Sequence, residues 1–262
     1  MKIYSKGGYY INLIKLRYPV NKLLNALVWD VVGKIINNKK RLEEFYYKPA
    51  RYIAYRDYGL KFPGSYPIVE MFVEKIYTQY NDFIPKPGDI IVDVGAQYGD
   101  YAILCAKYYK AKVFAFEPLK SNFRIIKSNI KFNKLNKNSI NAYNFALGAE
   151  SKKIEISFDN DMMNSLNTTK KQRTSVKTLD TYSLKPDILK IDVEGFEMDV
   201  LKGAVKTIKR HHPKIILEVH TKALKEQCIK FLSYFGYKIV HYGRIMRPKD
   251  IEFDEVQNLF LY

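Results

Sequence analysis

Short apolar runs alternate with amphipathic stretches from residue 85 onward, and this alternation predicts the fold. Each apolar run has the length of a buried strand, and the stretches between them repeat apolar residues at helical spacing. Strands are predicted at residues 90–94, 112–116, 140–147, 187–193, 214–219, 237–241 and 257–262. Helices are predicted at residues 98–109, 119–134, 196–209 and 221–235. Strands that alternate with helices in this way form an α/β domain around a mostly parallel, doubly wound sheet.

Two further strand-like runs interrupt the alternation. Residues 152–158 and 173–179 have no clear helix between them, and the polar stretch FDNDMMNSLNTTKK joins them. A polar connection of this kind predicts an antiparallel insertion, because parallel strands need a longer crossover, usually a helix.

The part of the chain before this pattern has a different character. Residues 1–84 are predicted to form a basic, largely helical extension, followed by one domain over residues 85–262. Residues 21–36 repeat apolar side chains at helical spacing. Residues 1–61 hold 13 Lys and Arg against 4 Asp and Glu, and the whole chain has a net charge of +17. The basic helix can contact nucleic acid or an anionic membrane surface, or it can pack against the protein's own core.

The apolar content suits a large core and no membrane span. Hydrophobic residues make up 47% of the chain, yet no stretch approaches the roughly 18 apolar residues of a transmembrane helix. No signal peptide is evident. Cys105 and Cys228 fall in apolar-periodic stretches, which favours buried, reduced thiols. These features predict a cytoplasmic protein.

Candidate chemistry begins at the end of the strand 90–94. Ligands of doubly wound sheets bind beyond the carboxyl ends of the strands. Asp93 precedes a glycine turn whose two glycines allow a tight bend. Gln97 stands where a dinucleotide fingerprint has its middle glycine, and Asp93 would repel a diphosphate but attract an ammonium group. The methionine part of S-adenosylmethionine (SAM) fits better, and we assign to it Asp93 and the turn residues Gly95, Ala96, Gln97, Tyr98 and Gly99.

The next two strand ends are assigned to the rest of the cofactor. Glu117, followed by Pro118, ends the strand 112–116, where a carboxylate can accept both ribose hydroxyl groups. The alternative for Glu117 is an acid that caps the following helix. Backbone groups around Phe145 and Ala146 are expected to lie by the adenine.

Lys190, Asp192 and Glu194 stand at alternate positions at the end of the predicted strand 187–193, which places them on one face. Such charges must be paired or line a cleft. Asp192 is the first choice for a general base or acceptor-positioning group, and it also borders the cofactor; Glu194 is second. Lys190 is expected to pair with a carboxylate. His220, with Glu218 two residues before it, is the other candidate base. The alternative is a salt-bridged strand end that only stiffens the fold.

Three acidic residues and one histidine at these strand ends have side chains that can bind a divalent cation. They are Asp192, Glu194, Glu218 and His220. Nothing in their spacing is specific to a metal, so no metal site is predicted.

An ordered series of motifs between about residues 86 and 240 resembles the FkbM-type family of SAM-dependent methyltransferases. The motifs are VDVGAQYGDYA, VFAFEPLKSNF, NFALGAESKKIEISF, VKTLDTY, DILKIDVEGFEMDVLKGA, PKIILEVH and LSYFGYKIV. The resemblance implies a seven-stranded, Rossmann-like class I methyltransferase sheet whose last strand is antiparallel. It also implies SAM as the cofactor and O-methylation of hydroxyl groups on sugars or other metabolites. Gln97 departs from the family, which usually has Asn there, and residues 1–60 lie outside the resemblance.

Three functions follow from these patterns. The first is O-methylation of a small-molecule or glycan acceptor. The second is methylation of RNA, with phosphates held by the basic N-terminal segment and bases stacked on its tyrosines. Against it, this strand end reads Asp192-Val-Glu-Gly instead of the Asn/Asp-Pro-Pro-aromatic sequence common in nucleobase methyltransferases. The third is a SAM-binding scaffold without catalysis. The sequence leaves the acceptor and the oligomeric state open.

Overall fold

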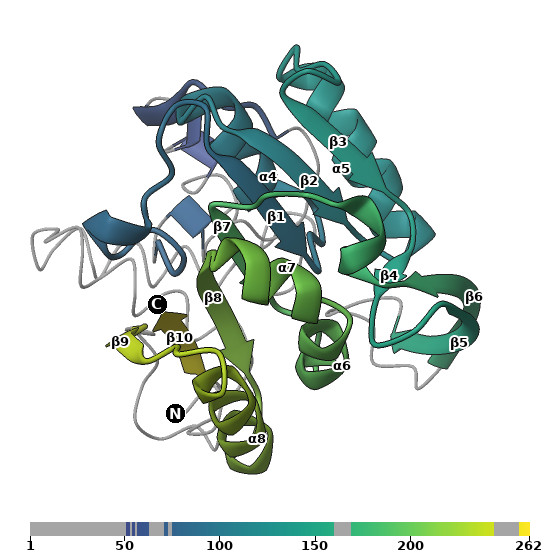
Figure 1. The fold of residues 1–262 in the computed structure, drawn as a ribbon. Coiled ribbons are helices and arrows are strands. Elements are labelled where there is room, and N and C mark those ends of the chain that lie inside the picture. Colours follow the sequence, from purple (N-terminus) through teal and green to yellow (C-terminus); the bar gives the residue numbers. More distant parts are fainter. Residues whose placement is uncertain are drawn as a thin grey trace, which may run out of the picture.

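A seven-stranded sheet forms the centre of the protein (Figure 1). The computed structural model describes residues 51–52, 54–55, 57–62, 71–72, 75–159, 169–243 and 257–262. The strand order is β3-β2-β1-β7-β8-β10-β9. The strands are β1 (Ile90–Val94), β2 (Lys112–Phe116), β3 (Ile140–Tyr143), β7 (Ile188–Ile191), β8 (Lys214–Val219), β9 (Ile239–Tyr242) and β10 (Gln257–Leu261).

The pairing confirms the predicted fold class. The pairs β3–β2, β2–β1, β1–β7 and β7–β8 are parallel, and β10 is antiparallel to both β8 and β9. The chain builds outward from β1 to β2 and β3, and then returns to place β7 on the other side of β1. The carboxyl ends of β1 and β7 therefore meet at the point where the strand order reverses, which is where ligands of such sheets bind.

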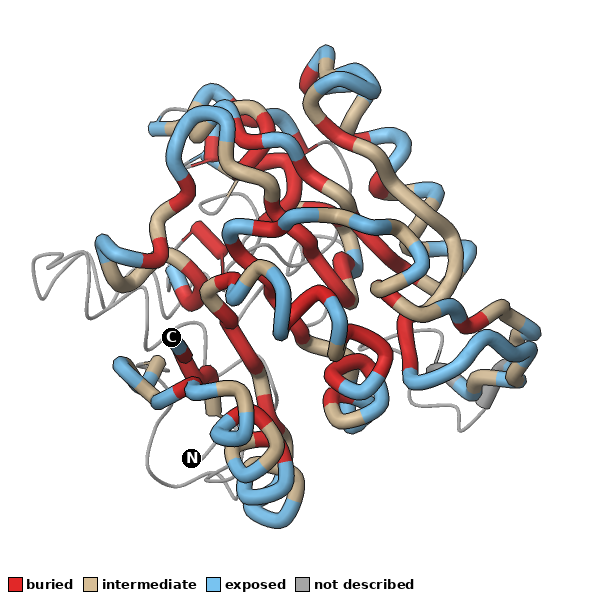
Figure 2. Tube along the Cα trace, in the orientation of Figure 1, coloured by how far each residue is buried: buried red, intermediate tan, exposed pale blue. Residues whose placement is uncertain are grey.

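Helices cover both faces of this sheet (Figure 1). One face packs against α4 (Asp100–Ile103), the π-helix Leu104–Tyr108 that continues it, and α5 (Lys120–Phe132). The other face packs against α6 (Glu197–Lys202), α7 (Val205–His211) and α8 (Lys222–Ser233). Ile91 belongs to the first core cluster, and Val92 belongs to the second, because alternate strand residues point to opposite faces. Figure 2 shows the resulting buried centre along the strands.

The predicted insertion is also confirmed. The strands β5 (Lys152–Asp159) and β6 (Thr169–Lys177) pair in antiparallel fashion, and β4 (Ala146–Leu147) joins β6 to complete a three-stranded sheet. The predicted strand 140–147 is therefore two strands, β3 and β4, in different sheets. Most of the polar tip of the insertion lies outside the described residues.

The predicted helix 196–209 is interrupted, and the structure gives the reason. It is divided into α6 and α7 at Gly203 and Ala204. A Cβ atom on Gly203 would lie 2.0 Å from the carbonyl oxygen of Gly148, so the chain packs there too closely for a side chain. The break lies at this contact with a distant segment, and glycine also has low helix propensity.

Several described residues that precede β1 pack onto the sheet face that α4 covers. Ala54, Leu60, Phe72 and Tyr77 belong to the same buried cluster as Ile103 of α4. The predicted helix 21–36 lies outside the described residues, and the division of the chain at residue 84 stays a prediction. Within the described ranges, no helix has both the length and the apolar character needed to cross a membrane. Both cysteines are buried and free, as predicted.

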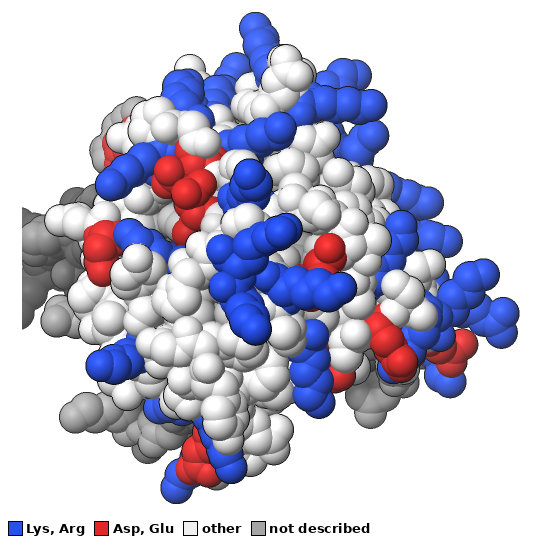
Figure 3. Space-filling model, in the orientation of Figure 1, with Lys and Arg blue, Asp and Glu red and all other residues white. Residues whose placement is uncertain are grey.

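Basic side chains are spread over the face drawn in Figure 3. Acidic and uncharged groups lie between them. On this face the positive charge is dispersed, in contrast to the single basic stripe that marks many nucleic-acid-binding surfaces.

Candidate active site

The glycine turn after β1 is shaped by close contact with the end of β7. Gly95 has a φ of 77°, and a Cβ atom on it would lie 1.7 Å from the carbonyl oxygen of Asp192. The N–H groups of Gly95 and Ala96 both donate to the carbonyl of Phe116 at the end of β2. These two N–H groups are therefore bonded within the protein. The turn allows its backbone to approach a ligand closely, but these two groups do not serve as donors to that ligand.

Glu117 joins the glycine turn to the start of α5. Its Oε2 accepts the N–H of Gln97 at 2.8 Å, and its Oε1 accepts the N–H of Leu119, also at 2.8 Å. Burial raises the pKa of Glu117 to about 7, although the two backbone donors oppose this shift. Glu117 is neither the N-cap residue of α5, which is Leu119, nor an acid of its first turn, so the capping alternative considered for it is not found. Each oxygen still has a second lone pair for a ligand hydroxyl group, so ribose binding stays a prediction.

The residues predicted to follow Glu117 around the cofactor have structural partners of their own. The carbonyl of Pro118 accepts the side-chain amides of Asn144 and Gln172. The ring of Phe145 stacks on that of Tyr182 with 5.9 Å between centroids. Ala146 pairs with β6 in the small sheet.

A pocket opens at the carboxyl ends of β1 and β7. Six of the predicted site residues line it, namely Asp93, Gly95, Ala96, Gln97, Lys190 and Asp192. The remaining lining residues are Met71, Ile76, Tyr77, Asp100 and Tyr101. The other predicted cofactor residues, namely Tyr98, Gly99, Glu117, Pro118, Phe145 and Ala146, are outside this lining among the described residues, and their contact with a cofactor stays a prediction.

Lys190 is the cation at the base of this pocket. Its Nζ lies 3.3 Å from Oδ1 of Asp93 and 3.2 Å from Oδ2 of Asp192, and it donates to the carbonyl of Gly95 at 3.0 Å. Burial alone would lower the pKa of Lys190, but the carboxylates of Asp192 and Asp93 hold it above its ordinary value. Burial raises the pKa of Asp93, and Lys190 opposes that rise. The predicted pairing of Lys190 with a carboxylate is confirmed.

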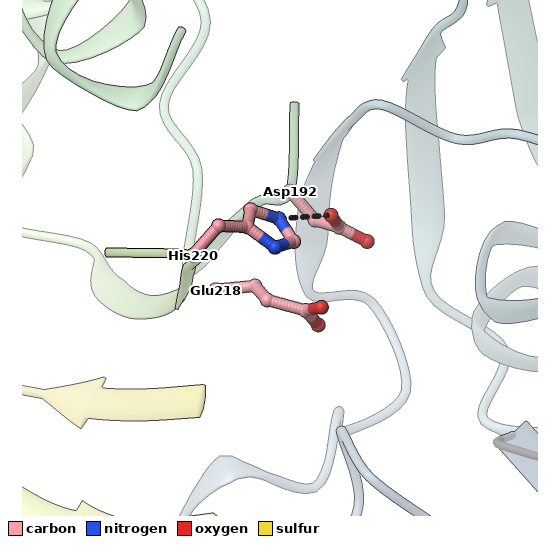
Figure 4. A group of neighbouring side chains, drawn as sticks. All are labelled: Asp192, Glu218 and His220. Carbon is pink, nitrogen blue, oxygen red and sulfur yellow. Dashed lines mark ion pairs between the residues drawn. The ribbon is translucent and has the colours of Figure 1, made fainter. Parts of the chain in front are cut away.

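Asp192 follows β7 and is held from several sides (Figure 4). The hydroxyl of Tyr77 donates to its Oδ2 at 2.7 Å, and Nε2 of His220 lies 3.9 Å from its Oδ1. Burial would raise the pKa of Asp192, but the charge of Lys190, the nearby imidazole of His220 and the hydrogen bond from Tyr77 hold it well below its ordinary value. Asp192 is therefore ionised at neutral pH, despite its buried position.

His220 lies at the end of β8 as the partner of two carboxylates. Besides its contact with Asp192, its Nε2 lies 3.5 Å from Oε2 of Glu194. The nearby carboxylate of Asp192 raises the pKa of His220 to about 9 against the effect of burial, and the charges of Glu194 and Glu218 add to the rise. His220 is therefore protonated at neutral pH, which makes Asp192 the better placed of the two to accept a proton there. Glu194 itself is 84% exposed.

Comparison with known proteins decides the family. The sequence profile of the Methyltransferase FkbM domain matches residues 93–239. This chain belongs to the FkbM methyltransferase family.

Two curated relatives are similar to part of this FkbM-family chain. Hexuronic acid methyltransferase AglP of Haloferax volcanii is 30% identical over 159 residues, which cover 55% of this chain and 62% of the relative. Methyltransferase 1 of Beauveria bassiana is 27% identical over 166 residues, which cover 51% of this chain and 64% of the relative. The chain thus spans less than two thirds of the length of either relative.

Two solved structures share the fold of this FkbM-family chain. The methyltransferase FkbM of Methylobacillus flagellatus KT matches with a TM-score of 0.53 and 20% identity, over 72% of this chain and 47% of that chain. The human methyltransferase 10 domain containing protein matches with a TM-score of 0.51 and 13% identity, over 84% and 97% of the two chains. At these identities, the likeness establishes the Rossmann-like fold alone.

Tyr77 and Glu197 are among the residues of the FkbM-family site that the sequence analysis did not assign. Tyr77 comes from the segment before the matched domain, where nothing in the pattern distinguishes it from the other tyrosines. Glu197 is fully buried, and its Oε1 accepts the N–H groups of Val193 and Gly195. Glu197 thereby holds the loop that follows Asp192. The sequence signal available for Glu197 was its position two residues after the turn glycine Gly195.

Three side chains of the FkbM-family site have ligand atoms close enough for a metal ion. One atom from each of Asp192, Glu218 and His220 lies within 4.8 Å of the others (Figure 4). Lys190 already places a cation 3.2 Å from Asp192, which opposes a second cation there. The absence of a resident metal stays a prediction.

Proposed function

We propose that this protein transfers the methyl group of SAM to a hydroxyl group of a sugar, a glycan or another small metabolite. The observation that carries this proposal is the position of Asp192. Its ionised carboxylate lies in the pocket beside the glycine turn, at the reversal point of a methyltransferase-family sheet. A carboxylate at this position can orient a hydroxyl acceptor and receive its proton.

The charge of the pocket lining fits SAM better than a dinucleotide. Asp93, Asp100 and Asp192 contribute three carboxylates, and Lys190 contributes one ammonium group. A lining with net negative charge attracts the sulfonium and ammonium groups of SAM and repels the diphosphate of NAD. We assign the methionine part to the turn between Gly95 and Gly99, the ribose to Glu117 with Pro118, and the adenine to the surroundings of Phe145 and Ala146.

Methyl transfer requires the protein to align the acceptor, to exclude water and to receive the acceptor's proton. When bound, SAM supplies a methyl group on a positively charged sulfur, ready for in-line displacement. The pocket walls align the acceptor oxygen and exclude water. Asp192 orients the acceptor hydroxyl and stabilises the positive charge that develops on its oxygen. As the new C–O bond forms, the hydroxyl proton passes to Asp192 and then to solvent past the exposed Glu194.

The choice of a sugar acceptor rests on similarity. The Haloferax volcanii relative is named a hexuronic acid methyltransferase, and a sugar offers the hydroxyl groups that the carboxylate chemistry requires. RNA is the competing acceptor, because the net charge of the chain is +17. The basic segment that would hold RNA, residues 1–61, lies largely outside the described residues.

Two measurements test this proposal. Calorimetric titration with SAM and with NAD is expected to show binding of SAM alone. Incubation with SAM labelled in its methyl group is then expected to label members of a panel of monosaccharides, uronic acids and oligosaccharides. Binding of NAD in place of SAM would overturn the cofactor assignment. Label in RNA alone would favour the RNA alternative, and SAM binding without label in any acceptor would favour the scaffold.

A further inference from the structure

Tyr77 connects the segment before the matched family domain to the carboxylates of the site. Its hydroxyl donates to Oδ2 of Asp192 at 2.7 Å and lies 3.3 Å from Oε2 of Glu218. Asp192 follows β7, and Glu218 belongs to β8, so one hydroxyl group bridges the ends of two neighbouring strands. Tyr77 lies outside the family match, which begins at residue 93.

The aromatic ring of Tyr77 is held as firmly as its hydroxyl group. The side chain is 7% exposed, and its ring meets that of Tyr101 edge to face with 5.3 Å between centroids. The ammonium of Lys190 lies over the ring at 4.9 Å from its centroid, a cation–π contact. A residue packed in this way presents its hydroxyl at a fixed place, with little rotational freedom to lose.

The two carboxylate oxygens of Asp192 have different contacts. Oδ2 accepts the Tyr77 hydroxyl and lies 3.2 Å from Lys190. Oδ1 faces His220 at the longer distance of 3.9 Å. The carboxylate is therefore anchored through Oδ2 by two residues, Tyr77 and Lys190, that themselves line the pocket.

We propose that Tyr77 is a positioning residue for methyl transfer: its hydroxyl anchors Asp192 through Oδ2 and so fixes the carboxylate at the pocket. This inference rests on the proposed function. It also means that the family-matched domain alone has an incomplete site, because the segment that carries Tyr77 supplies both a wall of the pocket and the anchor of its carboxylate.

The contact itself can be tested without any ligand. Tyr77→Phe removes the hydroxyl but keeps the ring and its packing. The effects of Tyr77→Phe and Asp192→Asn on the denaturant midpoint are expected to be non-additive, because the first variant removes the donor of this hydrogen bond and the second removes the charge of its acceptor. Tyr80→Phe is the matched control: it removes a hydroxyl from the same segment that donates to the carbonyl of Tyr242, away from the site. It is expected to add to Asp192→Asn. An additive cycle for Tyr77→Phe would overturn the inference.

Kinetics then test the positioning role. Tyr77→Phe is expected to lower kcat about tenfold or more with little change in SAM affinity, since a hydrogen bond to a charged group is lost. The acid limb of the pH–rate profile is expected to move to higher pH, because the ionised form of Asp192 loses a donor. A non-additive cycle with unchanged kcat and an unmoved acid limb would refute the positioning role. A wild-type protein that methylates no acceptor would refute the proposed function, and the ligand-free cycle would still decide whether Tyr77 holds Asp192.

Discussion

Lys190 and Asp93 face each other across the paired strands β7 and β1, with 3.3 Å between Nζ and Oδ1. Their side chains are only 4% and 1% exposed. Two charges this deeply buried are tolerated because each compensates the other, and Asp192 adds a second negative charge to the group.

We expect the removal of Lys190 to destabilise the fold. Lys190→Met leaves Asp93 buried without its cation, and breaking such a pair costs about 3–5 kcal/mol. Chemical denaturation followed by circular dichroism measures this loss. Lys209→Met, at an exposed position of α7, is the control and should change the stability by less than about 0.5 kcal/mol. Equal stability of the two variants would contradict the inferred compensation.

Gly95 should tolerate no side chain, since Asp192 passes so close to it. Gly88→Ala provides the matched control, because Gly88 also has a positive φ, of 92°, but a Cβ atom added to it would meet no other atom within 4 Å. We expect Gly88→Ala to cost about 1–2 kcal/mol from backbone strain. Gly95→Ala should cost about 1–3 kcal/mol more, from overlap with the carbonyl of Asp192. Thermal unfolding of both variants gives the comparison, and similar costs would show that the close approach is absent in solution.

Asp192 should matter for turnover more than for cofactor affinity. Asp192→Asn keeps the shape but removes the proton acceptor, and we expect kcat to fall about 10²- to 10⁴-fold. SAM affinity, measured by calorimetry, should change far less. Asp89→Asn, in the surface turn before β1, should leave both quantities unchanged. Full activity of Asp192→Asn would remove this residue from the chemistry.

The stability that His220 contributes should disappear at alkaline pH. Its pKa is raised to about 9 in the folded protein, from an ordinary value of 6.5. The folded state therefore binds the proton more tightly, so the contribution is fully present below about pH 6.5 and is lost as the pH rises through about 9. The difference in free energy of unfolding between wild type and His220→Gln should shrink over this range. A difference that is independent of pH would show that the imidazolium is not paired with Asp192.

Chelation of divalent cations should leave methyl transfer intact. The ammonium of Lys190 beside Asp192 already occupies the electrostatic place of a cation. We expect the same turnover after dialysis against EDTA as before it. Activity that is lost on dialysis and restored by Mg²⁺ would instead identify Asp192, Glu218 and His220 as metal ligands.

Local periodicity was enough to find most of the fold. The strands β1, β2 and β8 have their predicted bounds, because each is a short apolar run with polar residues or turn signals on both sides. The predictions over residues 140–147 and 196–209 were too long. In the second case, the interruption lies at Gly203, where the chain passes too close to Gly148 for a side chain, and local spacing carries no information about such a contact.

The sequence by itself determined which strand ends gather the buried charges, because alternation within a strand and the topology of a doubly wound sheet together place Asp93, Lys190 and Asp192 at one edge. Only the tertiary structure decided which partners those groups have. Tyr77 and Asp192 are 115 residues apart in the chain, and their hydrogen bond depends on how a segment before the domain packs across the sheet. Packing of this kind depends on the complementarity of whole surfaces, which no local pattern encodes.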